Sequence, residues 1–181
     1  MTKITLVTGA ASSGKSEWAE SLAKNQSQQV IYIATAQKIE SDTEWMTKIQ
    51  IHQQRRPQSW QCLEVPFQLS NAIDKCDNHH LILIDSLGTW VANFIEKEDT
   101  FWQQQSEQLL SSLASSNNHI ILVAEETGWG VIPAYKMGRL FRNRLGSLTR
   151  QIGQLADEVF LVVAGYAVDI SKIGVNIDAK P

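Results

Sequence analysis

The stretch ITLVTGAASSGKS, residues 4–16, decides the fold of this chain. It begins with a short apolar run rich in β-branched residues, which is typical of a buried strand. It continues into Gly9–Ser16, which match the pattern G-x-x-x-x-G-K-S at every fixed position. The glycines let the backbone turn tightly around a phosphate, and the helix that follows presents its N-terminus to the anion. Strand, loop and helix together predict a phosphate-binding P-loop.

The P-loop makes further demands on the chain. Lys15 is expected to reach the β- and γ-phosphates of a bound nucleotide, and Ser16 to hold Mg²⁺. Such a site also needs an acidic residue at the end of a nearby strand to position the hydrated metal. The run LILID ends in Asp85, although helix capping would explain an aspartate there about as often. Glu125 and Glu126, after the run IILVA, are either a second metal-site or general-base carboxylate or surface charge.

Apolar runs alternate with helix-like stretches along the whole chain, which predicts an α/β fold. Strands are expected at 4–8, 30–35, 81–85, 120–124 and 159–163, and helices at 15–24, 42–53, 101–112 and 134–155. Glycines 138, 146 and 153 would permit a kink or break in the last helix, and the tail after Gly165 suggests an edge strand or hairpin. We therefore expect one domain over residues 1–181, with a mostly parallel central sheet, helices on both faces and a RecA-like P-loop NTPase fold.

Composition excludes several classes of protein. The formal net charge is −3 and the sequence pI about 5.8, which argues against a nucleic-acid binder because phosphate-backbone affinity rests on clustered Lys and Arg. The two cysteines match no zinc or redox motif and are too few for a disulfide framework. The N-terminal apolar run resembles neither a signal peptide nor a membrane span. We expect a cytoplasmic protein without a membrane segment.

A second unusual stretch is IHQQRRPQSW, residues 51–60. Pro57 cannot sit inside a helix, so a helix should end just before it. Arg55 or Arg56 can clamp phosphate oxygens through the guanidinium fork. A neutral histidine beside a bound triphosphate, here His52, can act as a general base or attack phosphorus itself. On this stretch alone, a solvated turn with surface arginines is the simpler interpretation.

Taken in order, the blocks of this sequence resemble the bifunctional adenosylcobinamide kinase / adenosylcobinamide-phosphate guanylyltransferases. HQQRRPQSWQCLE (52–64) is similar to the family block H-x-x-R-R-P-x-x-W-x-x-x-E. The other similar blocks are ITLVTGAASSGKS (4–16), YIATA (32–36), LIDSLGTWVANF (83–94), ETGWGVIP (126–133), the R-x-F-R-x-x-L-G pattern (139–146) and ADEVFLVVAG (156–165). The similarity covers nearly the whole chain, and the ordered set is far more specific than the P-loop alone.

The resemblance implies a two-step role in cobalamin assembly. The family phosphorylates the aminopropanol hydroxyl of adenosylcobinamide with a nucleoside triphosphate, GTP or ATP, and then transfers GMP from GTP to that phosphate through a covalent GMP–histidine intermediate. The matching histidine is His52, with Lys15 as a second catalytic residue and Mg²⁺ as cofactor on Ser16 and Asp85. The resemblance also implies a homo-oligomer, as a trimer. The implied nucleotide-binding residues are Gly9, Ala10, Ala11, Ser12, Ser13, Gly14, Lys15, Ser16, Ala34, Thr35, Ala36, Gln53, Gln54, Arg55, Arg56, Glu64 and Asp85.

This chain departs from the family pattern at four positions. Gly88 stands where relatives often carry threonine, Ser86 where cysteine is common, and Glu125 where asparagine is frequent. Gln53 lacks the basic group that many relatives place beside the histidine. These changes leave the guanylyltransferase elements intact, but they leave open whether the kinase step and the affinity for cobinamide are retained.

Two other functions remain possible from the sequence. A P-loop kinase of another small metabolite would use the phosphate site and leave His52 structural. A nucleotide-dependent switch or RecA-like module would bind GTP without transferring any part of it. The absence of an N-K-x-D motif argues against a Ras-type guanine switch.

Overall fold

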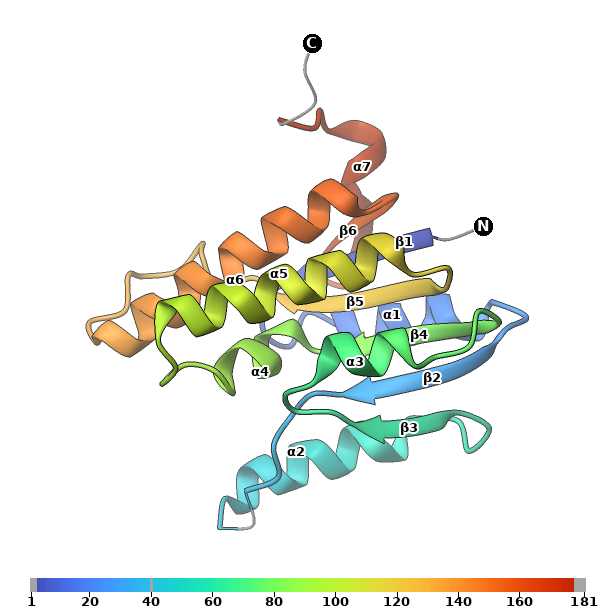
Figure 1. Cartoon of the computed structure of the whole chain (residues 1–181), viewed down its shortest axis with the longest axis horizontal. Coiled ribbons are helices and arrows are strands. Elements are labelled where there is room, and N and C mark those ends of the chain that lie inside the picture. The colour runs from blue at the N-terminus through green and yellow to red at the C-terminus, as the bar shows by residue number, and fades with distance from the viewer. Residues whose placement is uncertain (1–2, 40, 178–181) are drawn as a thin grey trace.

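The computed structural model describes residues 3–39 and 41–177 and is built on one central sheet (Figure 1). The strands are β1 (Lys3–Gly9), β2 (Gln29–Ala34), β3 (Gln61–Glu64), β4 (His80–Asp85), β5 (His119–Glu125), β6 (Glu158–Val163) and β7 (Tyr166–Asp169). They lie in the order β3-β2-β4-β5-β1-β6-β7. All neighbours are parallel except β7, which pairs antiparallel with β6.

Helices cover both faces of this sheet. They are α1 (Lys15–Lys24), α2 (Thr43–Gln54), α3 (Leu69–Asp74), α4 (Leu87–Ala92), α5 (Asp99–Ser115), α6 (Lys136–Leu155) and α7 (Ile170–Ile173). In Figure 1, α3 to α6 lie in front of the sheet, where they enclose the larger apolar core, and α1 packs behind it on the smaller one. Within the described residues, no helix combines the length and the apolar character needed to cross a lipid bilayer.

The predicted elements are confirmed with small shifts at their ends, and the predicted edge hairpin is present as β6 and β7. The α6 helix runs unbroken past its glycines, since Leu145, Leu148 and Ile152 bury its apolar face, and this packing outweighs a cost of about 1 kcal/mol per helical glycine. Sequence reasoning missed β3, α3, α4 and α7. Each is only four to six residues long, too short for periodicity to be read.

The sheet brings the ends of four central strands to one edge. In the strand register, Ala34 lies beside Asp85 across β2 and β4, and Gly9 lies beside Glu125 across β1 and β5. Ligands of open parallel sheets bind outside these carboxyl ends, where the connecting loops diverge. The fold therefore places the P-loop and both candidate acidic positions around one point.

Candidate active site

The P-loop has the backbone conformation that its sequence predicts. Gly14, the N-cap of α1, has φ of 91°, a left-handed conformation that favours glycine. At Gly9 a side chain is excluded, since a Cβ atom would lie 2.4 Å from the carbonyl oxygen of Val162. Lys15 and Ser16 begin α1 and are buried, and the Lys15 Nζ donates to the Ala10 carbonyl oxygen at 3.2 Å. The loop thus holds its cation and its helix N-terminus at the edge of the sheet.

Asp85 lies directly beside the P-loop. Ser16 Oγ donates to Asp85 Oδ1 at 3.4 Å, so the two residues predicted to hold Mg²⁺ are neighbours. The N-cap of α4 is Ser86 rather than Asp85, which removes helix capping as the explanation for the aspartate. No three His, Cys, Asp or Glu side chains of residues 3–39 and 41–177 gather as a metal cluster. Mg²⁺ at nucleotide sites takes one or two protein ligands plus phosphates and water, so the Ser16–Asp85 pair suits it.

Tyr32 holds the other oxygen of Asp85. Its hydroxyl donates to Asp85 Oδ2 at 2.6 Å, and its burial together with the Asp85 charge raises the pKa of Tyr32 far above its ordinary value. The phenol therefore stays protonated and remains a donor. The Arg56 guanidinium lies 3.6 Å above the centre of the tyrosine ring, and Trp60 stacks on the same ring. Sequence reasoning missed Tyr32, although a phenol hydroxyl in the middle of the apolar run VIYIAT was a signal for a buried polar contact.

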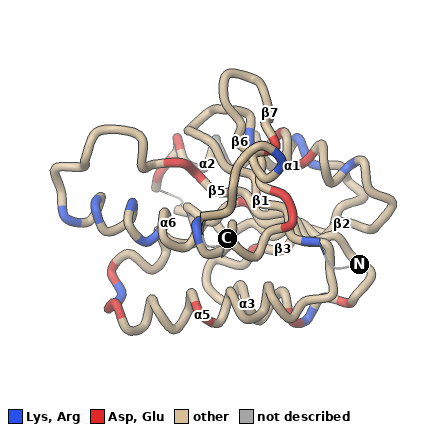
Figure 2. The backbone as a smooth tube through the Cα atoms, turned by 90° about the horizontal axis from the view of Figure 1, so that it is seen from above, with Lys and Arg blue, Asp and Glu red and all other residues tan. Residues whose placement is uncertain are grey.

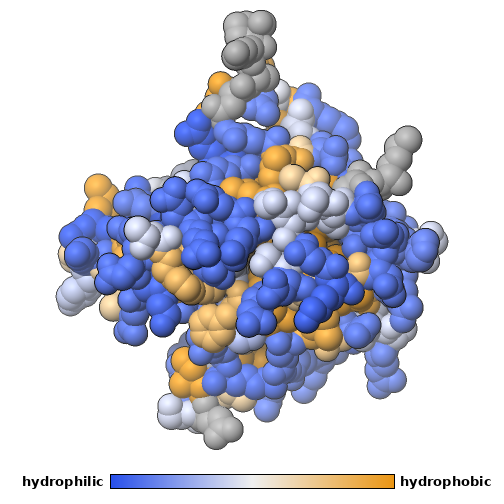
Figure 3. Space-filling model, in the orientation of Figure 1, coloured by the Kyte–Doolittle hydropathy of each residue, from blue (hydrophilic) through white to orange (hydrophobic). Residues whose placement is uncertain are grey.

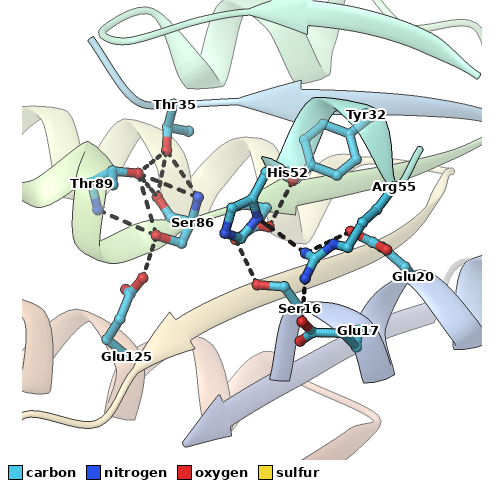
Figure 4. A network of polar contacts seen from close by, with 11 residues as sticks. Ser16, Glu17, Glu20, Tyr32, Thr35, His52, Arg55, Ser86, Thr89 and Glu125 are labelled. Carbon is cyan, nitrogen blue, oxygen red and sulfur yellow. Dashed lines mark hydrogen bonds and ion pairs between the residues drawn. The ribbon is translucent and has the colours of Figure 1, made fainter. Parts of the chain in front are cut away.

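His52, on α2, lies beside Asp85 and Arg55. Its Nδ1 lies 3.8 Å from Asp85 Oδ2 and 3.1 Å from Arg55 Nη2 (Figure 4). Arg55 in turn bonds to Glu17 and Glu20 on α1. A guanidinium only donates, so Nδ1 accepts here and the ring proton is on Nε2. We call Ser16, Glu17, Glu20, Tyr32, His52, Arg55 and Asp85 the His52 cluster.

A second polar group, the Glu125 cluster, consists of Thr35, Ser86, Gly88, Thr89 and Glu125. Figure 4 shows Thr35, Ser86, Thr89 and Glu125 on the side of His52 opposite to Arg55. Ser86 Oγ donates to Glu125 Oε1 at 2.6 Å, and the Gly88 N–H donates to Oε2 at 2.9 Å. Ser86 and Thr89 form a capping box at the start of α4, and Thr35 Oγ1 donates to the Ser86 carbonyl oxygen at 2.6 Å.

Three of the four departures from the family pattern meet in the Glu125 cluster. A Cβ atom at Gly88 would lie 2.0 Å from Glu125 Oε2, so the carboxylate fills the space that a larger residue 88 would need. Ser86 supplies the hydroxyl that the same carboxylate accepts. The three positions are therefore one packing solution rather than three separate changes. The sequence contains these three residues, but it does not show that they are in contact.

A cavity of about 340 Å³ lies between the two clusters. Eleven of the predicted site residues line it, namely Ala11, Ser12, Lys15, Ser16, Ala34, Ala36, His52, Gln53, Arg56, Glu64 and Asp85. Of the others, Gly9, Ala10, Ser13 and Gly14 form the P-loop backbone, Thr35 is buried in the Glu125 cluster, Gln54 is exposed, and Arg55 pairs with Glu17 and Glu20. Glu64 pairs with Lys38 at the rim. The volume is at the lower end of the range for small-molecule sites.

The sequence of this chain is similar to one family of known proteins. The family model described as cobinamide kinase / cobinamide phosphate guanyltransferase matches residues 5–170. The chain is 33% identical over 180 residues to the bifunctional adenosylcobalamin biosynthesis protein CobU of Escherichia coli (strain K12), covering 91% of this chain and 98% of that protein. It is 36% identical over 167 residues to the bifunctional adenosylcobalamin biosynthesis protein CobP of Pseudomonas aeruginosa, covering 91% and 95%.

Solved structures support the fold alone. An ATPase from the type III secretion system of pathogenic bacteria matches with a TM-score of 0.53 and 11% identity, covering 98% of this chain and 59% of that one. A Pyrococcus horikoshii OT3 protein matches with a TM-score of 0.58 and 4% identity, covering 93% and 85%. These likenesses agree with the predicted P-loop NTPase fold. By its family model and its relatives, the chain belongs to the cobinamide kinase / cobinamide phosphate guanyltransferase family.

Proposed function

We propose that this chain phosphorylates adenosylcobinamide and then transfers GMP from GTP to the resulting phosphate through a covalent intermediate on His52. The observation that carries the proposal is the position of His52 Nδ1, 3.8 Å from the same carboxylate that contacts Ser16 of the P-loop. One aspartate thereby links the expected metal position to the expected nucleophile. A kinase with a structural histidine would not need this convergence.

The guanylyl transfer is two displacements at phosphorus. The unprotonated imidazole nitrogen attacks the α-phosphorus of GTP, the P–N bond forms, and the bond to the bridging oxygen breaks so that pyrophosphate leaves. A phosphate oxygen of the acceptor then attacks the same phosphorus, the P–N bond breaks, and the neutral imidazole returns. Lys15 would stabilise the charge that develops on the phosphates, and Ser16 and Asp85 would hold Mg²⁺, which neutralises charge on the leaving group.

Arg55 gives the His52 cluster two arrangements. As long as Arg55 donates to His52 Nδ1, that lone pair is occupied and cannot attack phosphorus. Phosphate oxygens accept from guanidinium at least as well as imidazole does. Bound nucleotide would therefore draw Arg55 away from His52, leaving Nδ1 free or able to donate to Asp85 with Nε2 as nucleophile.

The test is covalent labelling with Mg²⁺ and α-labelled GTP, followed by denaturation. We expect acid-labile, alkali-stable label from α-labelled but not from γ-labelled GTP, and a fall of at least about 10³-fold in the His52→Ala variant. His79→Ala is the matched control, because His79 is exposed outside the site in the turn before β4. Equal labelling in both variants, or none in the wild type with GTP still bound, would refute transfer through His52.

The kinase step is tested separately by transfer of γ-label to cobinamide. We expect the His52→Ala variant to retain this transfer, since phosphorylation needs the P-loop and Asp85 but no histidine nucleophile. Parallel loss of both reactions would indicate instead that His52 supports the fold of the site.

Self-association completes the proposal. The segment before α6 and its first turn expose several large apolar side chains: Trp129, Ile132, Tyr135 and Met137. Exposed apolar groups of this size, gathered along one segment, mark interaction surfaces. We expect a homo-oligomer, as a trimer, in light scattering after size-exclusion chromatography.

A further inference from the structure

A second, larger cavity opens on the other side of Glu125. Its volume is about 900 Å³, and it lies between α6 and residues 170–177, over β1 and β6. We propose that this cavity binds the corrinoid ring of the acceptor, so that the acceptor's reacting arm reaches the nucleotide past Glu125. The inference rests on the proposed function and adds to it the place of the second substrate.

The two cavities share one lining residue. Glu125 lines both the 340 Å³ cavity at the P-loop and the 900 Å³ cavity beside α6. It ends β5 and lies beside Gly9 in the strand register, so the junction is at the phosphate loop itself. A ligand in the larger cavity therefore has a short path to the phosphates.

Size separates the two ligands. A nucleotide engaged with Lys15, Ser16 and His52 uses the smaller cavity, whose 340 Å³ leaves no room for a macrocycle larger than the nucleotide itself. The larger cavity is near the upper limit that small-molecule sites reach. Of the two, it is therefore the cavity suited to the larger ligand.

The walls suit a ligand with apolar faces and amide arms. Leu6, Val159 and Val175 give an apolar surface, whereas Glu126, Arg142 and Asp157 add charge. Figure 3 shows apolar atoms gathered near the C-terminal end of α6, and Figure 2 shows basic residues spaced along that helix. A corrinoid presents this combination, with an apolar ring edged by carboxamides.

Two threonine hydroxyls in the cavity wall are available for hydrogen bonds with a ligand. Thr8 Oγ1 and Thr149 Oγ1 are buried and have no hydrogen-bond partner among the described residues, and both threonines line the cavity. Buried polar groups in native proteins normally have partners. The amide arms of a corrinoid offer both donors and acceptors to such groups.

The helical wall provides a clean test. A Cβ atom at Gly146 would meet no heavy atom within 4 Å, and one at Gly153 would meet only Leu6 Cδ2 at 3.8 Å. Gly146→Leu and Gly153→Leu should therefore fill the cavity without a backbone clash, and each replaces a poor helix former. Gln151→Leu is the matched control, since Gln151 is exposed on the same helix and does not line the cavity.

Cobinamide binding to the full chain is measured by equilibrium dialysis with visible absorption. We expect both cavity variants to bind cobinamide at least about tenfold more weakly, because the added side chain occupies the space that the ligand needs. Gln151→Leu should bind cobinamide with normal affinity. GTP affinity and covalent labelling by α-labelled GTP should stay within about twofold of wild type in all three variants.

Each alternative outcome has a distinct meaning. Unchanged cobinamide affinity in the folded cavity variants would overturn the inference. So would a changed oligomeric state with normal cobinamide affinity, since the groove would then be covered by a second copy of the chain. If the wild type binds cobinamide and takes up label, either result refutes only the acceptor site. A wild type that shows neither property would instead refute the proposed function.

Discussion

The two polar clusters of the site are built in different ways. The His52 cluster joins residues of α1, α2, β2 and β4, and its His52 and Glu17 side chains are 39% and 58% exposed, although Glu20 and Tyr32 within it are buried. Its links to α1 are ion pairs of Arg55 with Glu17 and Glu20. The Glu125 cluster is packed around buried groups, with Thr35 at 0% and Ser86 at 3% exposure. Its links are short hydrogen bonds to backbone and side chains.

This difference indicates which side of the site is suited to change shape. The exposed Arg55–Glu17 ion pair contributes about 0–1 kcal/mol, so Arg55 can exchange Glu17 for phosphate at little cost while it stays paired with the buried Glu20. Hydrogen bonds to a charged group contribute about 1.5–3 kcal/mol, and leaving a buried partner unsatisfied costs a similar amount. We therefore regard the Glu125 cluster as a fixed frame and the His52 cluster as the part that rearranges.

The largest effect should come from Asp85, which belongs to the His52 cluster and lies next to the Glu125 cluster. Asp85→Asn keeps the shape and an acceptor for Tyr32 but removes the charge that we assign to the metal. We expect both the kinase and the guanylyl transfer rates to fall about 10²–10³-fold with the melting temperature nearly unchanged. Rates of γ-label and α-label transfer measure this, and loss of only one reaction would separate the two steps at Asp85.

The next largest effect should come from a change within the Glu125 cluster. Gly88→Thr puts a side chain into the Glu125 carboxylate, where a Cβ atom alone would lie 2.0 Å from Oε2, and we expect a loss of about 1–3 kcal/mol in unfolding free energy. Adding Glu125→Asn shortens the opposing side chain, so the double variant should recover much of that loss. Urea unfolding of the two single variants and the double variant gives the coupling. Additive effects would mean that the two positions do not share one space.

Tyr32→Phe tests whether Asp85 in the His52 cluster depends on its hydrogen bond from Tyr32. The variant keeps the ring under Arg56 and Trp60 but loses the donor to Asp85 Oδ2. We expect covalent labelling to slow about tenfold and to require more Mg²⁺, since one hydrogen bond to a charged group is lost. Tyr166→Phe on β7, where the tyrosine is exposed, is the control. Equal rates in both variants would show that Asp85 is held without the phenol.

The smallest effect on stability should follow from Glu17→Gln. Glu17 is the exposed partner of Arg55, with its side chain 58% exposed, so the unfolding free energy should change by less than about 1 kcal/mol while the buried Glu20 keeps its partner. Labelling should stay at the wild-type rate, because Arg55 remains as the phosphate clamp. A loss above about 2 kcal/mol in the free energy of urea unfolding would show that the His52 cluster is held as firmly as the Glu125 cluster. That outcome would contradict the difference between the two clusters.

Sequence patterns were sufficient for most of the fold. The P-loop, the five apolar runs and the four longer helices follow from motif and periodicity, which are local properties. The short pieces β3, α3, α4 and α7 did not follow, because pieces of this length are stabilised by the parts of the fold beside them rather than by a pattern of their own. For the site, the motif named Lys15 and Ser16, and the acid at the end of an apolar run named Asp85, whereas Tyr32 was overlooked.

By itself, the sequence determined the P-loop, since G-x-x-x-x-G-K-S carries its own loop and cation. It also determined the family, through blocks whose order is as informative as their residues. Only the tertiary structure decided that His52 and Tyr32 meet Asp85, that Glu125 excludes a side chain at residue 88, and that Glu125 lines two cavities. The physical reason is that strand order and helix packing bring together residues that are distant along the chain, and no local pattern encodes that distance.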